Sequence, residues 1–381
     1  MKKLLFITHD TSLSGAPKSV LLYLEWLKKN KNHKIDVVSL RTVEGLLERF
    51  KAVSNHFYDA SKFSKSPTYS IIDRIKHHLL GVNFISEYDV FLNNLNSNQY
   101  DLVVANTIIA IPLALEIKNT SKHTKLAVYI HELETVIREF NPKIENELKE
   151  FDCIIAASNL VKTNLVENFN LAPEKISVVY ETTEVSSQVQ SSEIKSEKAS
   201  FNVVMVGGAY WRKGDDLFLL IASIVLKKLK LTSVHFYWIG AMSEERSRVN
   251  FADIKKLGIT ENVHFVGEVN EPSLLLIDMD LFMLTSREDP FPLSALEAGM
   301  MGLPILCFDQ GTGIKEIINE RNGRVVPYLD IQKMAEEVCY YFSEIQSARF
   351  NKTDISKSYN EFTSNINAPK LDELISKCLK M

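Results

Sequence analysis

The chain has 381 residues, of which 45% are hydrophobic and 24% charged, a composition typical of a globular protein with room for two or more domains. Lysine and arginine number 44 and aspartate and glutamate 48, so the formal net charge is −4. This balance argues against a strongly electrostatic nucleic-acid binder, and the composition excludes disordered, fibrous and disulfide-rich proteins. No run of eighteen apolar residues and no C-x-x-C spacing occurs, which predicts a cytoplasmic protein with reduced cysteines and no membrane span.

In the first half of the chain, short apolar runs alternate with stretches of helical period. Residues 4–8 are expected to form a buried strand, because the run is too short for a signal sequence and ends at His9 and Asp10. Further strands are predicted at 34–40, 102–105, 126–130, 153–156 and 176–179. Helices are predicted at 16–29, 111–118 and 160–169. Apolar strands separated by helices indicate a parallel sheet covered on both faces.

A polar segment then interrupts this alternation. Residues 184–200 are rich in Ser, Glu and Lys and have no apolar period, which predicts a linker. Beyond it, strands are predicted at 202–206, 234–239, 263–266, 281–284 and 304–308. Helices are predicted at 217–229, 293–301 and 331–342.

We therefore expect an α/β protein with two Rossmann-like, doubly wound parallel-sheet domains. The first is predicted over 1–183 and the second over 201–350, facing each other across a cleft that is the default ligand site. Residues 351–381 are predicted as a helical tail, and packing of this tail on the first domain is one option.

Residues 54–100 do not follow the alternation. Within them, residues 70–84 place apolar side chains at helical spacing with basic residues between. One interpretation is a helix that packs on its own sheet, which is what most amphipathic helices do. The other is a peripheral contact with the inner membrane surface or a lipid-linked acceptor.

The most informative stretch is residues 285–304, TSREDPFPLSALEAGMMGLP, which follows the predicted strand at 281–284. Open parallel sheets bind ligands at the carboxyl ends of their strands. Pro292 stands where a helix would begin, and amides near Phe291 and Leu293 would be free. Such a helix start attracts anions, phosphate in particular.

Two carboxylates flank this predicted helix. Asp289 precedes it, and Glu297 lies in its second turn among leucine and alanine residues, so Glu297 is expected to face a specific partner. Because carboxylates accept hydrogen bonds from sugar and ribose hydroxyls, the combination fits a nucleotide-sugar site. The alternative is that Asp289 caps the helix and Glu297 is solvated.

This segment resembles the E-x7-E region of retaining glycosyltransferases of family 4, which have the two-domain GT-B fold. In that pattern an acidic residue precedes a Phe, and a Glu follows in the helix; here Asp289, Phe291 and Glu297 hold those positions. Asp replaces the usual first Glu and is one methylene shorter. The donor-binding positions that follow from this segment are Ser286, Phe291, Pro292, Leu293 and Glu297.

A second resemblance lies at the start of the second half. Gly207 is followed by Arg212 and Lys213, which resembles the G…KG loop of the family, whose basic residue neutralises the leaving diphosphate. Gly208 stands where the family often has an Arg, so Arg212 is expected to carry the second positive charge. Both cations would stabilise a developing phosphate anion.

Other segments fall in the family's order. Gly15 and Ala16 resemble the Gly-rich loop whose backbone approaches the donor phosphate and sugar. His131 resembles the His at a strand end that lies near the reacting sugar, and Gly267 and Glu268 match the loop that flanks the nucleobase. Taken alone, Gly15 and Ala16 would also fit an ordinary turn, and His131 a structural residue.

Asp278 and Asp280 form a D-x-D of the kind that other glycosyltransferases use to bind a metal. Here they precede a buried strand, so we expect a role in strand entry. The resemblance also implies an enzyme that uses Lys and Arg in place of a cation, with no metal and no cofactor.

The sequence therefore predicts a retaining hexosyltransferase that moves a sugar from a nucleotide-diphosphate sugar to a glycan, lipid-linked or other hydroxyl acceptor. Surface polysaccharide or glycoconjugate biosynthesis is the expected setting, with no nucleic-acid partner. The expected catalytic residues are His131, Lys213 and Asp289. Two alternatives remain: a non-catalytic protein that binds a sugar nucleotide, and a sugar-nucleotide epimerase of GT-B fold.

Overall fold

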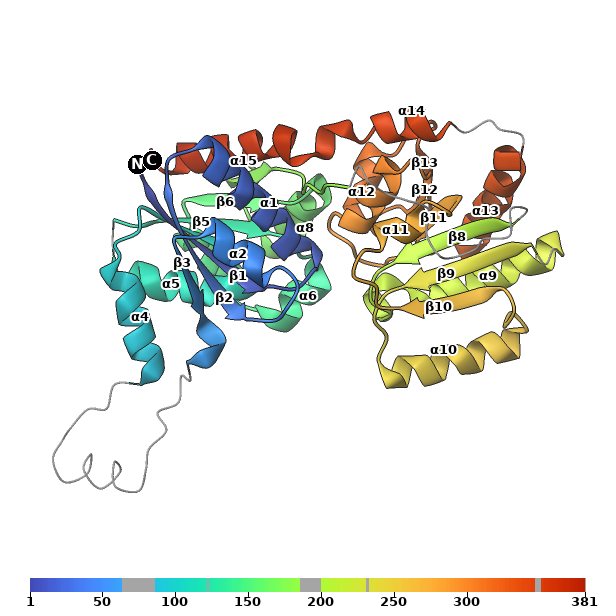
Figure 1. The fold of residues 1–381 in the computed structure, drawn as a ribbon, viewed down its shortest axis with the longest axis horizontal. Helices are drawn as coiled ribbons and strands as arrows, with labels where there is room; N and C mark the ends of the chain where they lie inside the picture. The colour runs from blue at the N-terminus through green and yellow to red at the C-terminus, as the bar shows by residue number, and fades with distance from the viewer. Residues whose placement is uncertain (64–85, 122, 186–199, 231–232, 347–350, 381) are drawn as a thin grey trace, which may run out of the picture. The chain divides into compact units, whose positions relative to one another are not determined.

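The computed structural model describes residues 1–380 apart from 64–85, 122, 186–199, 231–232 and 347–350 (Figure 1). The chain forms two compact units. The first consists of Met1–Ala156, Asn164–Val179 and Ala368–Met381, and the second of Ala157–Thr163 and Tyr180–Asn367. The longer segment of the second unit thus starts at Tyr180, close to the predicted boundary at residue 183, and the predicted tail is shared between the two units.

The first unit contains a seven-stranded sheet in the order β3-β2-β1-β4-β5-β6-β7, and all its strand pairs are parallel. Its strands are β1 (Lys3–Asp10), β2 (Lys34–Arg41), β3 (His56–Asp59), β4 (Leu102–Asn106), β5 (Lys125–Ile130), β6 (Cys153–Ala156) and β7 (Ile176–Val178). The order reverses between β1 and β4, and the carboxyl ends of neighbouring strands at such a reversal form the usual ligand site.

The helices of the first unit are α1 (Gly15–Asn30), α2 (Leu47–Val53), α4 (Glu87–Ser97), α5 (Ile111–Thr120), α6 (Glu134–Phe140) and α7 (Ile144–Glu147). Two further helices, α8 (Asn159–Phe169) and α15 (Ser364–Cys378), belong partly to each unit. The carboxyl-terminal part of α15 is held to the first unit by an ion pair of 2.8 Å between Lys31, just after α1, and Asp372.

The second unit contains a six-stranded parallel sheet in the order β10-β9-β8-β11-β12-β13. Its strands are β8 (Phe201–Val206), β9 (Val234–Ile239), β10 (Val263–Gly267), β11 (Leu281–Leu284), β12 (Ile305–Phe308) and β13 (Gly323–Val326). Its helices are α9 (Asp215–Leu229), α10 (Glu244–Leu257), α11 (Ser273–Leu276), α12 (Leu293–Met300), α13 (Ile331–Gln346) and α14 (Lys352–Lys357). Counted from β8, this is the 3-2-1-4-5-6 order of a Rossmann sheet.

Four of the apolar strands are buried along their whole length. Every residue of β4, β8, β11 and β12 is buried, which requires cover on both faces of each sheet. In the second unit, Phe218 of α9 meets the rings of Phe236 and Trp238 edge-on at centroid distances of 5.9 and 5.3 Å. The predicted α/β class with two doubly wound parallel sheets is confirmed.

Elements that the sequence reading missed are polar or lie at sheet edges. Strand β3 is only partly buried, and β13 begins with Gly323 and Arg324, so neither gives a continuous apolar run. Helix α10 buries only Asn250 and Ile254, and its N-cap is Ser243, whose hydroxyl accepts from the Arg246 amide. Apolar periodicity does not detect such elements.

Of the region that breaks the alternation, the structure describes residues 54–63 and 86–100. The predicted amphipathic stretch at 70–84 lies outside the described residues, as does most of the predicted linker, residues 186–199. Helix α4 opens with a capping box between Ser86 and Asp89.

Among the helices that the structure describes, none combines the length and the apolar character needed to cross a bilayer.

Candidate active site

The strand order of the second unit reverses between β8 and β11, and the segments that follow these strands meet. Lys213, in the one-turn 3-10 helix η5 (Trp211–Lys213), places Nζ 2.6 Å from Oδ2 of Asp289. The two side chains are only 12% and 6% exposed. Nη1 of Arg212 lies 3.6 Å from Oδ1 of the same carboxylate. Three of the predicted site residues are therefore in contact.

Asp289 is fixed by its neighbours rather than used as a helix cap. Its Oδ2 also accepts from the buried hydroxyl of Ser286 at 3.1 Å. Its amide donates to the Gly311 carbonyl at 2.8 Å, and its carbonyl accepts from the Gly313 amide at 3.0 Å. The residue that caps α12 is Pro292, with no side-chain cap bond. The alternative in which Asp289 caps the helix is therefore wrong.

Glycines let the loop after β8 lie against the loop after β11. Gly214 has a φ of +73°, and a Cβ there would lie 2.2 Å from the Thr285 carbonyl oxygen. A Cβ on Gly207, whose φ is +155°, would lie 3.3 Å from Cε of Lys213. Only glycine combines these dihedrals with so close an approach. The G…KG spacing thus has a local structural cause.

Helix α12 starts next to this pair. Its first amides, those of Leu293 and Ser294, have no acceptor one turn earlier in the helix. The hydroxyl of Ser294 donates to the Val206 carbonyl at 3.1 Å, which ties the helix start to the end of β8. The Phe291 side chain is buried against Tyr180 and Phe362 at centroid distances of 4.9 and 5.8 Å. Phe291 would therefore contact a ligand through its backbone and not through its ring.

Glu297 is buried, with 8% of its surface exposed, and Oε1 accepts from the hydroxyl of Thr183 at 2.8 Å. The alternative that Glu297 is solvated is therefore wrong. Thr183 was not found from the sequence, because it lies 114 residues away and belongs to no motif.

Glu316 anchors the start of α8 within the second unit. Its carboxylate accepts from the amides of Asn159 and Leu160 at 3.0 and 2.8 Å and from the hydroxyl of Tyr180 at 2.8 Å. Burial, and then the hydrogen bond to Glu316, raises the pKa of Tyr180 to about 12. A carboxylate on the first amides of a helix is stabilising, so a structural role explains Glu316.

In the first unit the corresponding reversal, between β1 and β4, brings the predicted Gly-rich loop and His131 together. Asn106, the last residue of β4, donates from Nδ2 to the Ala16 carbonyl at 3.1 Å. Ala16 is the second residue of α1, which starts at Gly15. Oδ1 of Asn106 lies 2.9 Å from Nε2 of His131. Because the Ala16 carbonyl can only accept, Oδ1 of Asn106 is the acceptor of the second bond, and Nε2 of His131 carries the proton.

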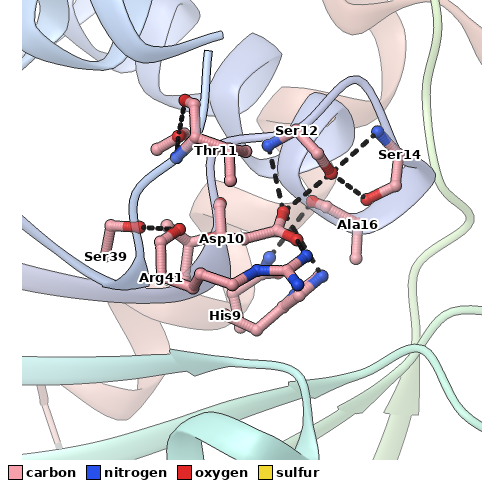
Figure 2. A network of polar contacts seen from close by, with 11 residues as sticks. His9, Asp10, Thr11, Ser12, Ser14, Ala16, Ser39 and Arg41 are labelled. Carbon is pink, nitrogen blue, oxygen red and sulfur yellow. Dashed lines mark hydrogen bonds and ion pairs between the residues drawn. The ribbon is translucent and has the colours of Figure 1, made fainter. Parts of the chain in front are cut away.

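A polar network at the end of β1 adds residues that sequence reasoning did not assign (Figure 2). Asp10 accepts from the amide and hydroxyl of Ser12 at 3.0 and 2.8 Å and from Nη2 of Arg41 at 2.8 Å. His9 Nε2 lies 3.6 Å from the same carboxylate. Burial lowers the pKa of His9, although the Asp10 charge acts in the opposite direction. His9 and Asp10, two polar residues directly after the apolar run at 4–8, were the available sequence signal.

Gly267 and Glu268 lie elsewhere. Gly267 ends β10 and Glu268 follows it, and β10 is separated from β8 by β9. The Gly267 carbonyl accepts from the Gly240 amide at 2.8 Å, and Glu268 is exposed. Within the described part of the chain, neither forms a hydrogen bond or ion pair with the Lys213–Asp289 pair, so a role beside the nucleobase stays a prediction.

The D-x-D segment acts at the opposite ends of the strands. Oδ2 of Asp280 accepts from the Asn202 amide at 2.8 Å, and the Asp278 carbonyl accepts from the Asn202 side chain at 3.1 Å. Burial raises the pKa of Asp280. Both residues therefore join the starts of β8 and β11, and the described residues contain no group of three or more His, Cys, Asp or Glu arranged to hold a metal.

Two doubly wound units, the second with two basic residues and a helix start at its strand reversal, form the GT-B fold of glycosyltransferases. Residues 13–184 match the family model described as Glycosyltransferase Family 4, and residues 200–344 match that described as Glycosyl transferases group 1. The chain belongs to the family-4 glycosyltransferases.

Similar proteins include bacterial glycosyltransferases. An uncharacterized glycosyltransferase of Haemophilus influenzae is 27% identical over 35% of this chain, and the Staphylococcus aureus capsular polysaccharide biosynthesis glycosyltransferase CapH is 24% identical over 58%. The chain spans 37% and 63% of the lengths of these relatives. The crystal structure of Anabaena Alr3699/HepE in complex with UDP and glucose matches with a TM-score of 0.80 at 16% identity, covering 99% of this chain and 100% of that one.

Proposed function

We propose that this chain transfers a sugar from a nucleotide-diphosphate sugar to a hydroxyl acceptor, with retention of the anomeric configuration and without a metal. The observation that carries the proposal is the Lys213–Asp289 pair, joined by Arg212, at the strand reversal of the second unit. In a family-4 chain this is where a leaving diphosphate needs positive charge.

The second unit is proposed to bind the donor. Lys213 and Arg212 stabilise the departing diphosphate, and the first amides of α12 add donors aimed at the same anion. Glu297 accepts hydrogen bonds from sugar or ribose hydroxyls. In this scheme Asp289 holds Lys213 in place before the donor arrives and contacts a sugar hydroxyl afterwards.

The first unit is proposed to supply His131 and the loop at Gly15 and Ala16. With Nε2 bound to Asn106, His131 is held in one orientation, as a group that positions sugar hydroxyls must be. The sugar carbon passes through an oxocarbenium-like state while the diphosphate leaves, and the leaving phosphate accepts the proton of the acceptor hydroxyl.

Two relatives suggest the substrates. Alr3699/HepE was crystallised with UDP and glucose, which makes UDP-sugars the first donors to test. CapH is named for capsular polysaccharide biosynthesis, so a surface glycan or its lipid-linked precursor is the proposed acceptor class.

The test is to incubate the purified chain with a panel of nucleotide sugars and simple glycoside acceptors. The anomeric proton coupling of the product by NMR reports retention or inversion, and parallel reactions with EDTA report metal dependence. A retained product that forms equally well with EDTA supports the proposal. Binding without turnover indicates a sugar-nucleotide sensor, isomerised donor without transfer indicates an epimerase, and loss of activity with EDTA contradicts metal independence.

A further inference from the structure

Arg287 joins the two loops that carry the candidate donor-binding charges. Its amide donates to the Arg212 carbonyl at 2.8 Å. Its Nη1 donates to the Trp211 carbonyl at 2.8 Å, and Nη1 and Nη2 hold the two carboxylate oxygens of Asp216 at 2.9 and 2.8 Å. One side chain, 11% exposed, thus contacts both ends of the segment that contains Lys213.

The guanidinium of Arg287 also lies against an aromatic ring. Its central carbon is 5.4 Å from the centroid of Trp211, whose side chain is 53% exposed. A planar guanidinium can stack on a ring and still direct donors in its own plane to a carboxylate and a carbonyl, which an ammonium cannot do. The site therefore requires arginine rather than any cation.

These contacts act on the geometry of the Lys213–Asp289 pair. Arg287 precedes Asp289 by two residues, and Lys213 ends the 3-10 turn whose first residue is Trp211. Two further bonds join the same loops: Nη1 of Arg212 donates to the Glu288 carbonyl at 2.6 Å, and the Thr285 hydroxyl donates to the Lys213 carbonyl at 3.1 Å. Without the Arg287 side chain, the segment would keep these bonds at Arg212 and Lys213 but lose those at Trp211 and Asp216.

We infer that Arg287, held by Asp216, is a positioning residue that sets Lys213 and Arg212 in place to meet the donor diphosphate. The inference rests on the proposed function, since it names the group that orients the same charges. Arg287 acts through the turn and does not itself touch the reacting atoms. A misplaced cation would weaken stabilisation of the leaving group more than it would weaken the fold.

A matched control lies in the same unit. Arg324 binds Glu337 at 2.9 Å and lies 4.0 Å from the ring centroid of Tyr340, so it has the same two kinds of partner away from the strand reversal. Three variants are compared with the wild type: Arg287→Ala, Arg287→Lys and Arg324→Ala. The measurements are thermal unfolding, UDP affinity by titration calorimetry, and kcat and KM with the best donor. Asp216→Asn, at a half-exposed carboxylate, provides a second route if Arg287→Ala does not fold.

We expect Arg287→Ala to lower kcat about 10²-fold and UDP affinity about tenfold, and Arg287→Lys to recover little of either. Asp216→Asn should lower both kcat and UDP affinity, but by smaller factors. Arg324→Ala should lose a comparable amount of thermal stability but stay within about twofold of the wild type in kcat and affinity. Equal behaviour of folded Arg287 and Arg324 variants overturns the inference.

The outcomes also separate this inference from the proposed function. If the wild type binds UDP but transfers no sugar, the proposed transfer fails, and the affinity comparison alone decides whether Arg287 positions the charges. A wild type that binds no nucleoside diphosphate overturns both.

Discussion

Nζ of Lys213 lies 2.6 Å from Oδ2 of Asp289, and both side chains are largely buried. The cation that is proposed to meet the diphosphate is therefore already paired, and Arg212 lies 3.6 Å from the other carboxylate oxygen. An arrangement of this kind keeps the charges oriented before the donor binds, so little reorganisation is needed at the moment of reaction.

Lys213→Ala is expected to lower transfer by about 10²-fold or more, because a preorganised charge on the leaving group is lost. It also leaves the Asp289 carboxylate without its nearest cation, which should cost about 1–3 kcal/mol of stability. Steady-state kinetics and denaturant unfolding measure the two effects. The double variant Lys213→Ala with Asp289→Asn should regain stability but not transfer. Turnover near the wild-type value in the single variant would remove Lys213 from the mechanism.

Glu297→Ala should weaken donor affinity about tenfold or more, as loss of a hydrogen bond to a charged group does. Thr183→Val removes the hydroxyl that binds Glu297 and should weaken donor affinity by a smaller factor. Thr182→Val is the matched control, because the Thr182 hydroxyl donates at the same 2.8 Å, to the Phe362 carbonyl. Calorimetric titration with UDP distinguishes them, and equal affinities in the Thr183 and Thr182 variants would show that Glu297 does not depend on Thr183.

The sheets could be predicted from the sequence because their strands are buried on both faces. Strand β11 gives four consecutive apolar residues, and its bounds at Leu281–Leu284 follow directly from them. Strand β13 reads GRVV at a sheet edge, where one side is solvated, and it gave no such run. Polar helices such as α10 failed for the same reason, since burial produces the periodicity that a sequence displays.

The site was predictable where its geometry is local. Lys213 and Gly214 are adjacent in the sequence, and Asp289 stands eight residues before Glu297. The spacing of the motifs was therefore sufficient to select these residues as candidates. Thr183 could not be found, because only the folded chain brings it to Glu297 across 114 residues. Arg287 was missed for another reason: an arginine in a polar loop becomes informative only when its partners Trp211, Arg212 and Asp216 are known.

Asn106→Leu should lower kcat about tenfold or more while leaving UDP affinity close to the wild-type value. The change removes the acceptor for His131 Nε2 and the donor to the Ala16 carbonyl at nearly constant volume. An imidazole that has lost this acceptor is held less firmly in one orientation, and misplacement reduces the rate more than donor binding. Asn141→Leu, which removes a bond of 2.8 Å to Glu147 in the same unit, controls for general destabilisation. Equal kcat in the two variants would contradict a positioning role for Asn106.

His9 is expected to titrate below the ordinary value of 6.5, because burial disfavours its charged form. The unfolded state then binds this proton more readily than the folded state does. The stability that neutral His9 contributes above its unfolded pKa is therefore lost as pH falls from that value through the lower, folded pKa. Asp10 raises the pKa of His9, and Asp10→Asn should lower the midpoint further. NMR titration of the imidazole checks both, and His9→Gln should flatten the fall in stability below pH 6.5. A midpoint at or above 6.5 in the wild type would contradict the effect of burial.

Gly214→Ala and Gly258→Ala separate backbone strain from steric contact. Their φ angles are nearly equal, +73° and +71°, but a Cβ on Gly214 would lie 2.2 Å from the Thr285 carbonyl oxygen, whereas one on Gly258 meets nothing within 4 Å. Both variants lose about 1–2 kcal/mol from the left-handed conformation, and Gly214→Ala loses about 1–3 kcal/mol more from the clash. Urea unfolding measures the difference. Because relief of the clash displaces the turn that carries Lys213, transfer should fall in Gly214→Ala and persist in Gly258→Ala. Equal losses of stability and equal transfer in the two variants would show that the loops after β8 and β11 are not in contact at Gly214.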